Sequence, residues 1–406
     1  MNDSAPLELE AARERILALV PPAQTELVEL SQAHQRILTG RLTAPLELPP
    51  FDNSAMDGYA VRAADLRGAS AGSPVELSLH GRVAAGEVFS GEVASGSCVR
   101  LFTGSPLPRG ADAVVMQEDT RINPGQTDCV SFLDSVKPWE NVRFRGEDVQ
   151  HGSVLAESGA PLTAGRLNLL AAAGMTQVAV GRRPVVGLLA TGSELIEAGQ
   201  PLSPGQIYES NRRGLAALAT LAGAVPRVFP LVPDTQAGTQ AALESAFREC
   251  DMVVTSGGVS VGEMDFIKSA FTALGGEVDF WKVAIRPGRP FVFGRHQSKF
   301  LFGLPGNPVS AFVTFLLLVR PALRRWQGAG EVNLPVYPGT LAEPLSNHGG
   351  RRHFVRVTVD TDGKVRSSGV QASHTMASLA AANGLVDLAP GLIFPSGTTV
   401  PVMVWE

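Results

Sequence analysis

VVGLLATGSEL, residues 185–195, decides the fold, because an unbroken apolar run there ends in a turn that contains threonine, glycine and serine. Such a run is typical of a β-strand that is covered on both faces of a parallel sheet. Similar runs occur at 252–258 (MVVTSGG) and at 300–307 (FLFGLPGN), with helical apolar spacing between them. This alternation between residues 183 and 328 predicts a doubly wound, mostly parallel α/β domain.

The segments around this domain follow a different pattern. Residues 61–138 contain short alternating apolar runs and no long helical pattern, which predicts a small β-rich domain. Near the C-terminus, FVRVTV (354–359) predicts a strand that Asp362-Gly363 turns back as a hairpin. At the N-terminus we expect a helix over 7–20 and a second helix over 31–39, with Ser31 as its N-cap.

Composition and charge exclude several classes of protein. With 44% hydrophobic and 18% charged residues, the 406-residue chain can build a core, so disorder is not expected. The net charge of −5 and the aromatic content of 6% argue against nucleic-acid binding. The three cysteines stand far apart, which excludes a disulfide framework and a zinc ribbon. No signal peptide is visible, and the longest apolar run, 311–319, is too short for a bilayer, so we expect a cytoplasmic protein with no membrane partner.

Three loops follow the predicted strands at the ends where open α/β sheets bind their ligands: TGSEL (191–195), SGGVSVG (256–262) and GLPGNPVS (303–310). Each combines hydroxyl or amide side chains with glycine, which lets backbone N–H groups approach an anion. None fits a P-loop or a dinucleotide-binding fingerprint. A tight strand-to-helix turn explains any one loop alone, but three together favour a phosphorylated or oxyanionic ligand. The candidate binding residues are Thr191, Ser193, Ser256, Gly257, Gly258, Ser260, Gly306 and Asn307.

Charged residues lie near the same predicted edge. Glu194, Asp234 and Asp265 are candidate Mg²⁺ ligands, because carboxylates beside a phosphate site hold this ion in many proteins. The alternative for Asp234 and Asp265 is that each only caps a helix. The segment WKVAIRPGRP (281–290) adds the cations Lys282, Arg286 and Arg289, which either neutralise phosphate oxygens or form a solvated charged strand face.

Three polar motifs lie outside this domain. They are FDNSAMDGYA (51–60), RLFTGSP (100–106) and RGEDV (145–149), which carry Asp57, Thr103 and Asp148 respectively. Residue chemistry alone makes them polar turns.

Eight stretches of the chain together resemble the MoeA family of molybdopterin molybdenumtransferases, which is related to the E domain of gephyrin. In family order they are PPFDNSAMDGYAVR (49–62), RLFTGSPLPRGADAVVMQED (100–119), RFRGEDV (143–149), ATGSEL (190–195), GQIYESN (205–211), TSGGVSVGEMDF (255–266), FWKVAIRPGRPFVFG (280–294) and GLPGNPVSAF (303–312). FDNSAMDGYA and GLPGNP are specific signatures of the family, which argues against a chance coincidence.

The resemblance implies a transferase that inserts molybdenum from molybdate into adenylyl-molybdopterin and releases AMP, giving the molybdenum cofactor. The implied cofactor is Mg²⁺, and the implied substrates are molybdate and adenylyl-molybdopterin. Members of the family are homodimers whose active cleft lies between subunits. The implied upstream partner is molybdopterin adenylyltransferase.

The same resemblance implies a multidomain architecture of α/β and β type. A split N-terminal α+β domain would comprise residues 1–46 and 139–182, and an inserted β-rich domain residues 47–138. The α/β molybdopterin-binding domain would comprise residues 183–328, and a C-terminal β-barrel-like domain residues 329–406.

Family roles transfer by motif position. The implied catalytic residues are Asp57, Thr103, Asp148, Glu194, Asp265, Lys282 and Arg286, and the implied metal ligands are Glu194, Asp234 and Asp265. Arg289, Pro305, Pro308 and Ser373 join the implied substrate-binding residues. Ser193 stands where many members have aspartate, and Arg286 and Arg289 replace lysines of the KPGKP pattern, which keeps the charge but changes a point charge into a planar fork.

Two other functions stay open on the sequence. A non-catalytic scaffold like the gephyrin E domain would bind a partner peptide, but the intact set of carboxylates argues for catalysis. The sibling activity, adenylylation of molybdopterin from ATP, belongs to an enzyme that resembles only residues 183–328. Consumption of ATP would support the adenylyltransferase, and release of AMP from an adenylylated substrate would support the molybdenumtransferase.

Overall fold

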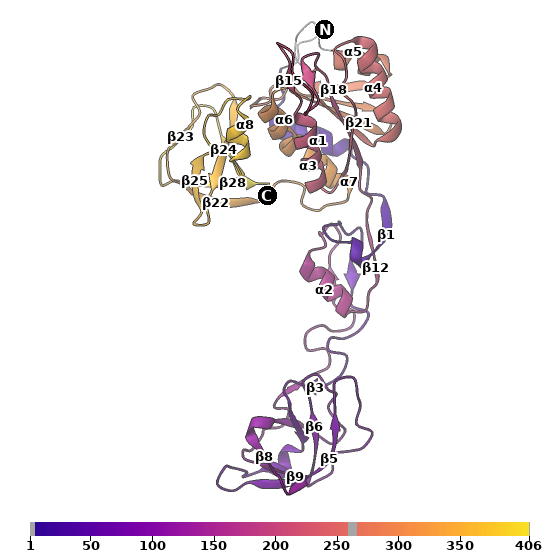
Figure 1. The fold of residues 1–406 in the computed structure, drawn as a ribbon, viewed down its shortest axis with the longest axis vertical. Helices are drawn as coiled ribbons and strands as arrows, with labels where there is room; N and C mark the ends of the chain where they lie inside the picture. The colour runs from indigo at the N-terminus through magenta and orange to yellow at the C-terminus, as the bar shows by residue number, and fades with distance from the viewer. Residues whose placement is uncertain (1–4, 259–265, 406) are drawn as a thin grey trace. The chain divides into compact units, whose positions relative to one another are not determined.

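The computed structural model describes residues 5–258 and 266–405 (Figure 1). By the density of their internal contacts, the residues divide into two compact units. Unit 1 comprises residues 1–40, 158–163 and 177–406, and unit 2 comprises residues 41–157 and 164–176. The finer division into four domains stays a prediction. None of the helices in the described residues is long and apolar enough to cross a membrane.

A six-stranded sheet forms the centre of unit 1, in the order β16-β13-β17-β21-β20-β18. Four strands run parallel to one another: β16 (Val225–Val228), β13 (Val185–Ala190), β17 (Met252–Ser256) and β21 (Lys299–Leu304). At one edge β20 (Val292–His296) and β18 (Glu277–Trp281) pair antiparallel. The predicted mostly parallel sheet is confirmed.

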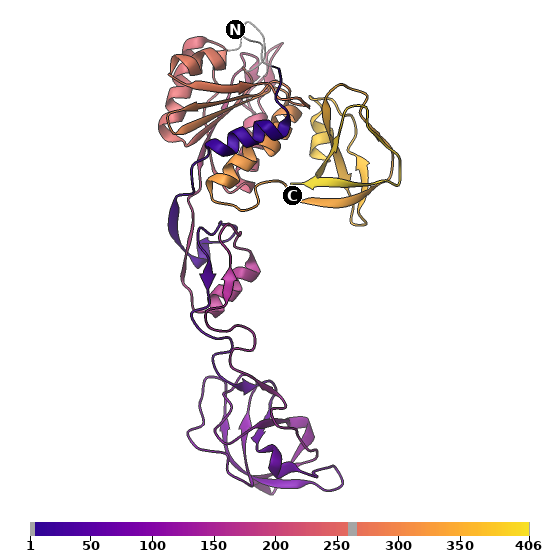
Figure 2. The same ribbon diagram turned by 180° about the vertical axis from the view of Figure 1, so that it is seen from behind.

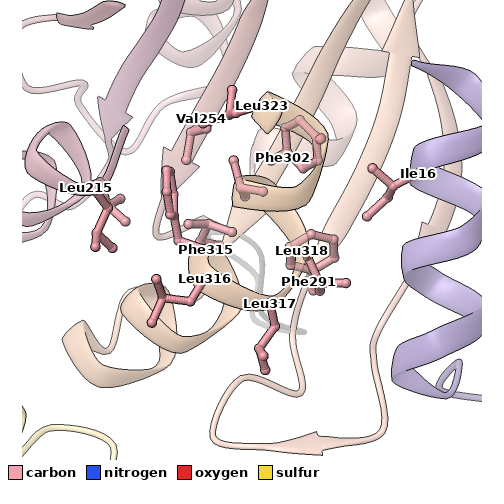
Figure 3. Packing of buried hydrophobic residues seen from close by; sticks show 14 of the residues in the cluster. Ile16, Leu215, Val254, Phe291, Phe302, Phe315, Leu316, Leu317, Leu318 and Leu323 are labelled. Atoms are coloured by element: carbon pink, nitrogen blue, oxygen red, sulfur yellow. The ribbon is translucent and has the colours of Figure 1, made fainter. Parts of the chain in front are cut away.

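Helices cover both faces of this sheet, so the fold is doubly wound. On one face α1 (Leu9–Leu19), α3 (Asn211–Leu221) and a long final helix pack on alternate strand residues such as Val254 and Phe302 (Figure 3). That final helix runs through α6 (Pro308–Thr314), a π-helical turn (Phe315–Val319) and α7 (Arg320–Trp326). Figure 2 shows α1, in indigo, beside this orange helix. On the other face α4 (Gln236–Glu249) and α5 (Phe266–Ala273) pack against intervening residues such as Leu189 and Val253.

The C-terminal strands close into a five-stranded barrel, which is yellow in Figure 1. The strands follow the order β24-β25-β22-β28-β26, and β26 pairs with β24 to complete the circle. Their bounds are β22 (Val336–Leu341), β24 (Arg352–Val359), β25 (Lys364–Ser367), β26 (Gly384–Leu388) and β28 (Thr399–Val404). The predicted hairpin is present, because β24 and β25 pair antiparallel around Asp362-Gly363. The barrel also carries α8 (Met376–Ala380), β23 (Leu345–Ser346) and β27 (Ile393–Phe394), and β19 (Ile285–Arg286) joins it by pairing with β24.

Unit 2 contains a six-stranded sheet in the order β7-β4-β6-β5-β9-β8. Its strands are β4 (Gly58–Val61), β5 (Val75–Val83), β6 (Ser97–Leu101), β7 (Ala113–Met116), β8 (Thr120–Asn123) and β9 (Gln126–Phe132). Two apolar clusters form its core. The predicted β-rich domain without a long helix is confirmed. Shorter elements of this unit are β2 (Leu42–Thr43), β3 (Asn53–Ser54), β10 (Val142–Arg143), β11 (Val154–Ala156) and α2 (Ala164–Ala172).

The helix predicted over residues 31–39 is wrong. Only a short 3₁₀ turn, Leu30–Gln32, forms there. The backbone N–H groups of Gln35 and Leu38 donate instead to the carbonyls of Leu162 and Ala160, at 2.9 and 3.0 Å. Pairing with a segment more than a hundred residues away replaces the local helical bonds, as tertiary context often overrides propensity. The strands β1 (Thr25–Glu29) and β12 (Gln177–Gly181) pair in the same region.

Candidate active site

The carboxyl ends of three neighbouring parallel strands are level with one another. Ala190 at the end of β13 is paired with Ser256 of β17, and Ser256 is paired with Leu304 of β21. From β13 the chain continues to β16 on one side of it and later to β17 on the other. Such a reversal of strand order opens a crevice where open α/β sheets bind ligands. For the described residues of the three loops, the prediction that they meet at one edge of the sheet is confirmed.

A cleft of about 720 Å³ lies at this edge. Ten residues selected from the sequence line it: Thr191, Glu194, Asp234, Ser256, Gly257, Gly258, Pro305, Gly306, Asn307 and Pro308. Within the described residues, its lining does not include Ser193, Lys282, Arg286, Arg289 or Ser373. Ser260 and Asp265 lie outside the described residues.

Hydrogen bonds and close backbone packing hold the floor of the cleft. Asn211 Nδ2 donates to Ser256 Oγ at 2.6 Å and to the Gly306 carbonyl at 2.7 Å, which ties two of the loops to α3. Gly257 has a φ of +89°, and a Cβ built on it would lie 2.7 Å from the Thr191 carbonyl oxygen. Only glycine fits this position. The polar backbone of the loops is therefore arranged before a ligand arrives, which is the requirement for electrostatic preorganisation.

Two carboxylates of the cleft flank the same short stretch of backbone. Asp234 Oδ2 accepts the backbone N–H of Ser193 at 2.9 Å. The carboxylate oxygens of Glu194 lie 2.8 and 2.9 Å from the place where a Cβ on Gly192 would sit. The loop after β13 thus brings the two negative charges to one side of the cleft.

Asp234 does not cap a helix, so the alternative for this residue is wrong. The N-cap of α4 is Thr235, whose side chain accepts the Gly238 N–H at 3.1 Å. Because its neighbour satisfies the helix terminus, the Asp234 carboxylate is available to the cleft.

Glu194 and Asp234 suit Mg²⁺ in their number and chemistry. This ion takes oxygen ligands, keeps several waters and usually needs one or two carboxylates besides substrate phosphate. No group of three or more His, Cys, Asp or Glu side chains that could hold a metal occurs in residues 5–258 and 266–405. The described residues therefore fit a site that substrate and water complete, and they do not provide an all-protein metal cage.

Thr191 brings an unsatisfied hydroxyl to the cleft. The residue is 8% exposed, and its Oγ1 has no hydrogen-bond partner among the described residues. A buried hydroxyl without a partner costs about 1–3 kcal/mol. A ligand oxygen in the cleft would remove this cost.

Lys282 lies at the same edge of the sheet, two strands beyond β21. It directly follows Trp281, the last residue of β18. Trp281 is paired with Val292 of β20, and Val292 is paired with Gly303 of β21, so the three residues lie at the same level of the sheet. Its Nζ lies 4.5 Å from the centre of the Trp281 ring, which is within range of a cation–π contact. Strands are about 4.8 Å apart, so β18 lies about 10 Å from β21.

Arg286 and Arg289 gather with a third arginine that the sequence analysis missed, Arg351. Arg351 Nη1 donates to the Ile285 carbonyl at 3.1 Å. Burial, and then the charges of Arg289 and Arg286, lower the pKa of the Arg351 guanidinium. None of these three arginines forms an ion pair with a carboxylate in the described parts of the chain. Together they make a cationic cluster where β19 meets β24.

A segment of the barrel forms one wall of the cleft. His374 and Met376 line it, and the adjacent Ser373 carbonyl accepts the Val309 N–H at the start of α6, at 3.2 Å. Ser373 therefore lies at the border of the cleft. Sequence reasoning missed His374 and Met376, because no local pattern says which barrel loop meets the α/β sheet.

Arg356 holds this wall from the barrel side. It is fully buried, and its Nη2 donates to Val370 O, Ala372 O and Ser378 Oγ at 2.7, 3.2 and 2.9 Å. Charge-assisted bonds of this kind are stronger than neutral ones. They fix the segment that contains Ser373 and His374.

Residues 207–211 also line the cleft, although we selected none of them as site residues. Glu209 is 7% exposed and accepts bonds from the backbone N–H and the Nε of Arg212, each at 2.8 Å. Arg212 Nη2 donates to Glu197 Oε1 at 2.6 Å. Burial alone would lower the pKa of Arg212. The hydrogen bonds with Glu197 and Glu209 have the larger combined effect, so the pKa of Arg212 is raised. The available signal was the family-like stretch GQIYESN (205–211).

In unit 2 the structure brings Asp57 and Thr103 together. Asp57 Oδ1 accepts both the backbone N–H and the hydroxyl of Thr103, each at 2.8 Å. These two bonds, and then the charge of Arg100, lower the pKa of the exposed Asp57. Asp57 is therefore ionised at neutral pH, which suits an acceptor better than a proton donor. Asp148 is an exposed carboxylate beyond β10 that is not bonded to either residue.

Three family models together match most of the chain. The MoeA N-terminal region (domain I and II) matches residues 7–174, the probable molybdopterin binding domain residues 187–325, and the MoeA C-terminal region (domain IV) residues 338–405.

Full-length relatives and a solved structure agree with these matches. The chain is 41% identical over 388 residues to a molybdopterin molybdenumtransferase of Haemophilus influenzae, with 94% of each chain covered. It is 36% identical over 409 residues to the enzyme of the same name from Bacillus subtilis, covering 100% of this chain and 95% of the relative. The crystal structure of the molybdopterin biosynthesis MoeA protein from Pyrococcus horikoshii superposes with a TM-score of 0.84 at 30% identity, covering 98% of this chain and 100% of that one.

Proposed function

The chain belongs to the MoeA family and is a transferase of molybdenum cofactor biosynthesis, and from this premise we propose that it inserts molybdenum from molybdate into adenylyl-molybdopterin and releases AMP. The observation that carries the proposal is the cleft at the reversal of strand order, where three glycine-containing loops and two carboxylates meet. A cytoplasmic location stays a prediction.

The cleft would take the phosphoanhydride that joins AMP to the terminal phosphate of the pterin. Breaking this bond requires stabilisation of negative charge on both phosphates. The Thr191 hydroxyl, which has no hydrogen-bond partner in the described parts of the chain, provides a polar group on one side of such a ligand, together with the side chains and backbone of Ser256, Gly257 and Asn307. Lys282, at the same sheet edge, would add positive charge.

We assign Mg²⁺ to Glu194 and Asp234, with Asp265 as a third candidate that lies outside the described residues. The fit rests on the two carboxylates that flank residues 192–193. The bound ion would act as a Lewis acid toward the phosphate oxygens. The role of the protein is to hold the two carboxylates in place, and the Ser193 N–H does this for Asp234.

Molybdate, a tetrahedral dianion, needs several cations or hydrogen-bond donors at one place. The cluster of Arg286, Arg289 and Arg351 supplies three guanidinium groups without carboxylate partners among the described residues. Guanidinium groups bind oxyanions through paired N–H donors. We therefore assign molybdate capture to this cluster, and Ser373, at the border of the cleft, is a further candidate.

The reaction is tested with the purified full chain, adenylyl-molybdopterin, Mg²⁺ and molybdate. We expect release of AMP together with cofactor that activates a cofactor-free molybdenum enzyme. Consumption of ATP with unmodified molybdopterin would instead support the adenylyltransferase. Absence of AMP release at saturating molybdate would contradict the proposal.

The metal assignment is tested by Asp234→Asn. We expect the Mg²⁺ concentration for half-maximal rate to rise at least about tenfold, because loss of a group that supports a metal site typically costs 10–100-fold in affinity. Asp362→Asn is the matched control, since Asn-Gly keeps the barrel hairpin and the residue lies outside the cleft. An unchanged Mg²⁺ dependence in Asp234→Asn would remove this residue from the site.

Asp57, Thr103 and Asp148 enter the proposal through the second copy of a homodimer, whose unit 2 we propose to complete the active cleft. Asp57→Asn should slow molybdenum insertion at low molybdate, and an unchanged rate would exclude Asp57 from the mechanism.

The shared cleft is tested with a mixed dimer of one Asp57→Asn chain and one Asp234→Asn chain, purified through two different tags. If each cleft combines residues of two copies, one of the two clefts in this dimer carries neither substitution, so activity returns. If both residues serve the same cleft of one chain, activity stays as low as in the single variants. A monomer in sedimentation analysis would also contradict the proposal.

A further inference from the structure

A second pocket, of about 280 Å³, opens beside the polar cleft and shares four lining residues with it: Ser210, Asn211, Pro308 and Met376. Most of its remaining lining is apolar and comes from α3, α6, α8 and the C-terminal end of the chain. A ligand bound in the cleft would therefore lie next to this pocket.

We propose that this pocket binds the adenine ring of the adenylylated substrate and of the product AMP, an inference that rests on the proposed function. The volume is just below the range of roughly 300–1,000 Å³ that is typical for whole small ligands, so the pocket suits a single ring system. The phosphates of the same molecule would lie in the adjoining cleft.

The polar content of the pocket favours adenine over the pterin. Its polar side chains are the hydroxyl of Ser210 and the amide of Asn211. The Asn211 Nδ2 already donates to Ser256 Oγ and to the Gly306 carbonyl. A pterin ring carries an amide, an amino group and several ring nitrogens, which would lose their water without finding partners there. Adenine carries fewer polar groups and has two broad π faces.

Two aromatic side chains offer stacking partners. Phe312 of α6 and Trp405 line the pocket, are both partly exposed, and form an edge-to-face pair with ring centroids 5.5 Å apart. Stacking of a nucleobase on protein aromatic rings recurs in nucleotide binding because every base has a π face.

Gly214 marks an open part of the pocket wall. It lies within α3 and lines the pocket, where glycine weakens a helix relative to alanine. Packing does not require it, because a Cβ built on Gly214 meets no atom within 4 Å. Its φ is not positive, so backbone conformation does not require it either. Gly214 is exposed, so a large side chain placed there would occupy open space at the pocket wall.

The proposal is tested by filling the pocket with Gly214→Phe in the full-length protein. Gly165→Phe is the matched control, because Gly165 lies in α2 of unit 2 and an added Cβ there also meets nothing within 4 Å. Calorimetry with AMP should give a dissociation constant at least about tenfold higher in Gly214→Phe than in the wild type, and an unchanged value in Gly165→Phe. Ribose 5-phosphate, which lacks the base, should bind all three proteins alike.

Steady-state kinetics give the second readout. With adenylyl-molybdopterin, Gly214→Phe should raise KM by a similar factor and leave kcat at saturation much less affected. Gly214→Leu, a smaller change that favours the helix, should give an intermediate effect and guards against a folding defect of the phenylalanine variant.

Unchanged AMP affinity in Gly214→Phe would overturn the adenine assignment, and so would wild-type protein that binds AMP no better than ribose 5-phosphate. Neither result affects the proposed reaction, which is judged by AMP release in the wild type. Conversely, failure of AMP release would end the proposed function, while the binding comparison would still decide whether the pocket accepts adenine.

Discussion

Arg212 is buried and Arg351 is exposed, and the groups around the two side chains also differ. Arg212 is 2% exposed and bonds to Glu209 and Glu197, whereas Arg351 bonds to one backbone carbonyl and lies near two further arginines. The pKa of Arg212 is raised by its carboxylates, and that of Arg351 is lowered by burial and by its like-charged neighbours.

The difference separates a structural cation from a binding one. A buried charge with its partners in place holds elements together, and removing one partner is costly. Repulsion within a cluster of like charges without carboxylates destabilises the folded chain, and a bound anion offsets this repulsion. We therefore expect changes at Arg212 to alter stability and changes at Arg351 to alter the dependence on ligand.

The largest effect is expected for Arg212→Met. It leaves Glu209 buried without its partner and should lower the free energy of unfolding by about 3–5 kcal/mol. Arg227→Ala is the control, because its pair with Glu249 is exposed and such pairs contribute about 0–1 kcal/mol. Urea unfolding measures both, and a loss of less than 1 kcal/mol in Arg212→Met would contradict a structural role.

The second effect concerns His353, which is 5% exposed. Burial, and then the charges of Arg286 and Arg356, lower its pKa to about 4 from an ordinary value of 6.5. The unfolded chain therefore binds a proton that the folded chain does not, so this residue makes stability fall as the pH is lowered from 6.5 to 4. The shift corresponds to a loss on the order of 3 kcal/mol.

Urea unfolding across this pH range checks the effect. His353→Gln should flatten the decline, while His348→Gln, at an exposed position, should keep it. Equal slopes in the wild type and in His353→Gln would show that His353 is not the titrating group.

Arg351→Gln should change ligand dependence without changing stability. Loss of one of three cations should raise the molybdate concentration for half-maximal rate about tenfold, and the urea midpoint should stay the same or rise. A large loss of stability with normal molybdate dependence would make Arg351 resemble Arg212 and would end the comparison.

The smallest effect is expected for Arg289→Lys. The substitution keeps the positive charge and returns the lysine of the family pattern, while it removes the planar fork. If the cluster acts through charge, molybdate dependence should change by less than about threefold. A change as large as that of Arg351→Gln would show that paired guanidinium donors, and not charge alone, hold the anion.

The sequence by itself determined the alternation of strands and helices, the mostly parallel sheet and the three loops at its edge. These follow from apolar periodicity and from Gly and Asn at strand ends, which act over a few residues. The same reasoning predicted a helix over 31–39, where backbone bonds to Ala160 and Leu162 form instead. It also left two roles open for Asp234, because an aspartate between a strand and a helix can either cap the helix or face a cleft.

Only the tertiary structure decided which distant groups meet. It placed His374 and Met376 on the cleft, gathered Arg351 with Arg286 and Arg289, and bonded Asp234 to the backbone N–H of Ser193 while Thr235 caps the helix. The free energy of a buried charge or an unpaired hydroxyl depends on partners that are remote in the chain, so no local pattern contains it. Folding brings these partners together, and with them the features that distinguish a binding cleft from a set of polar turns.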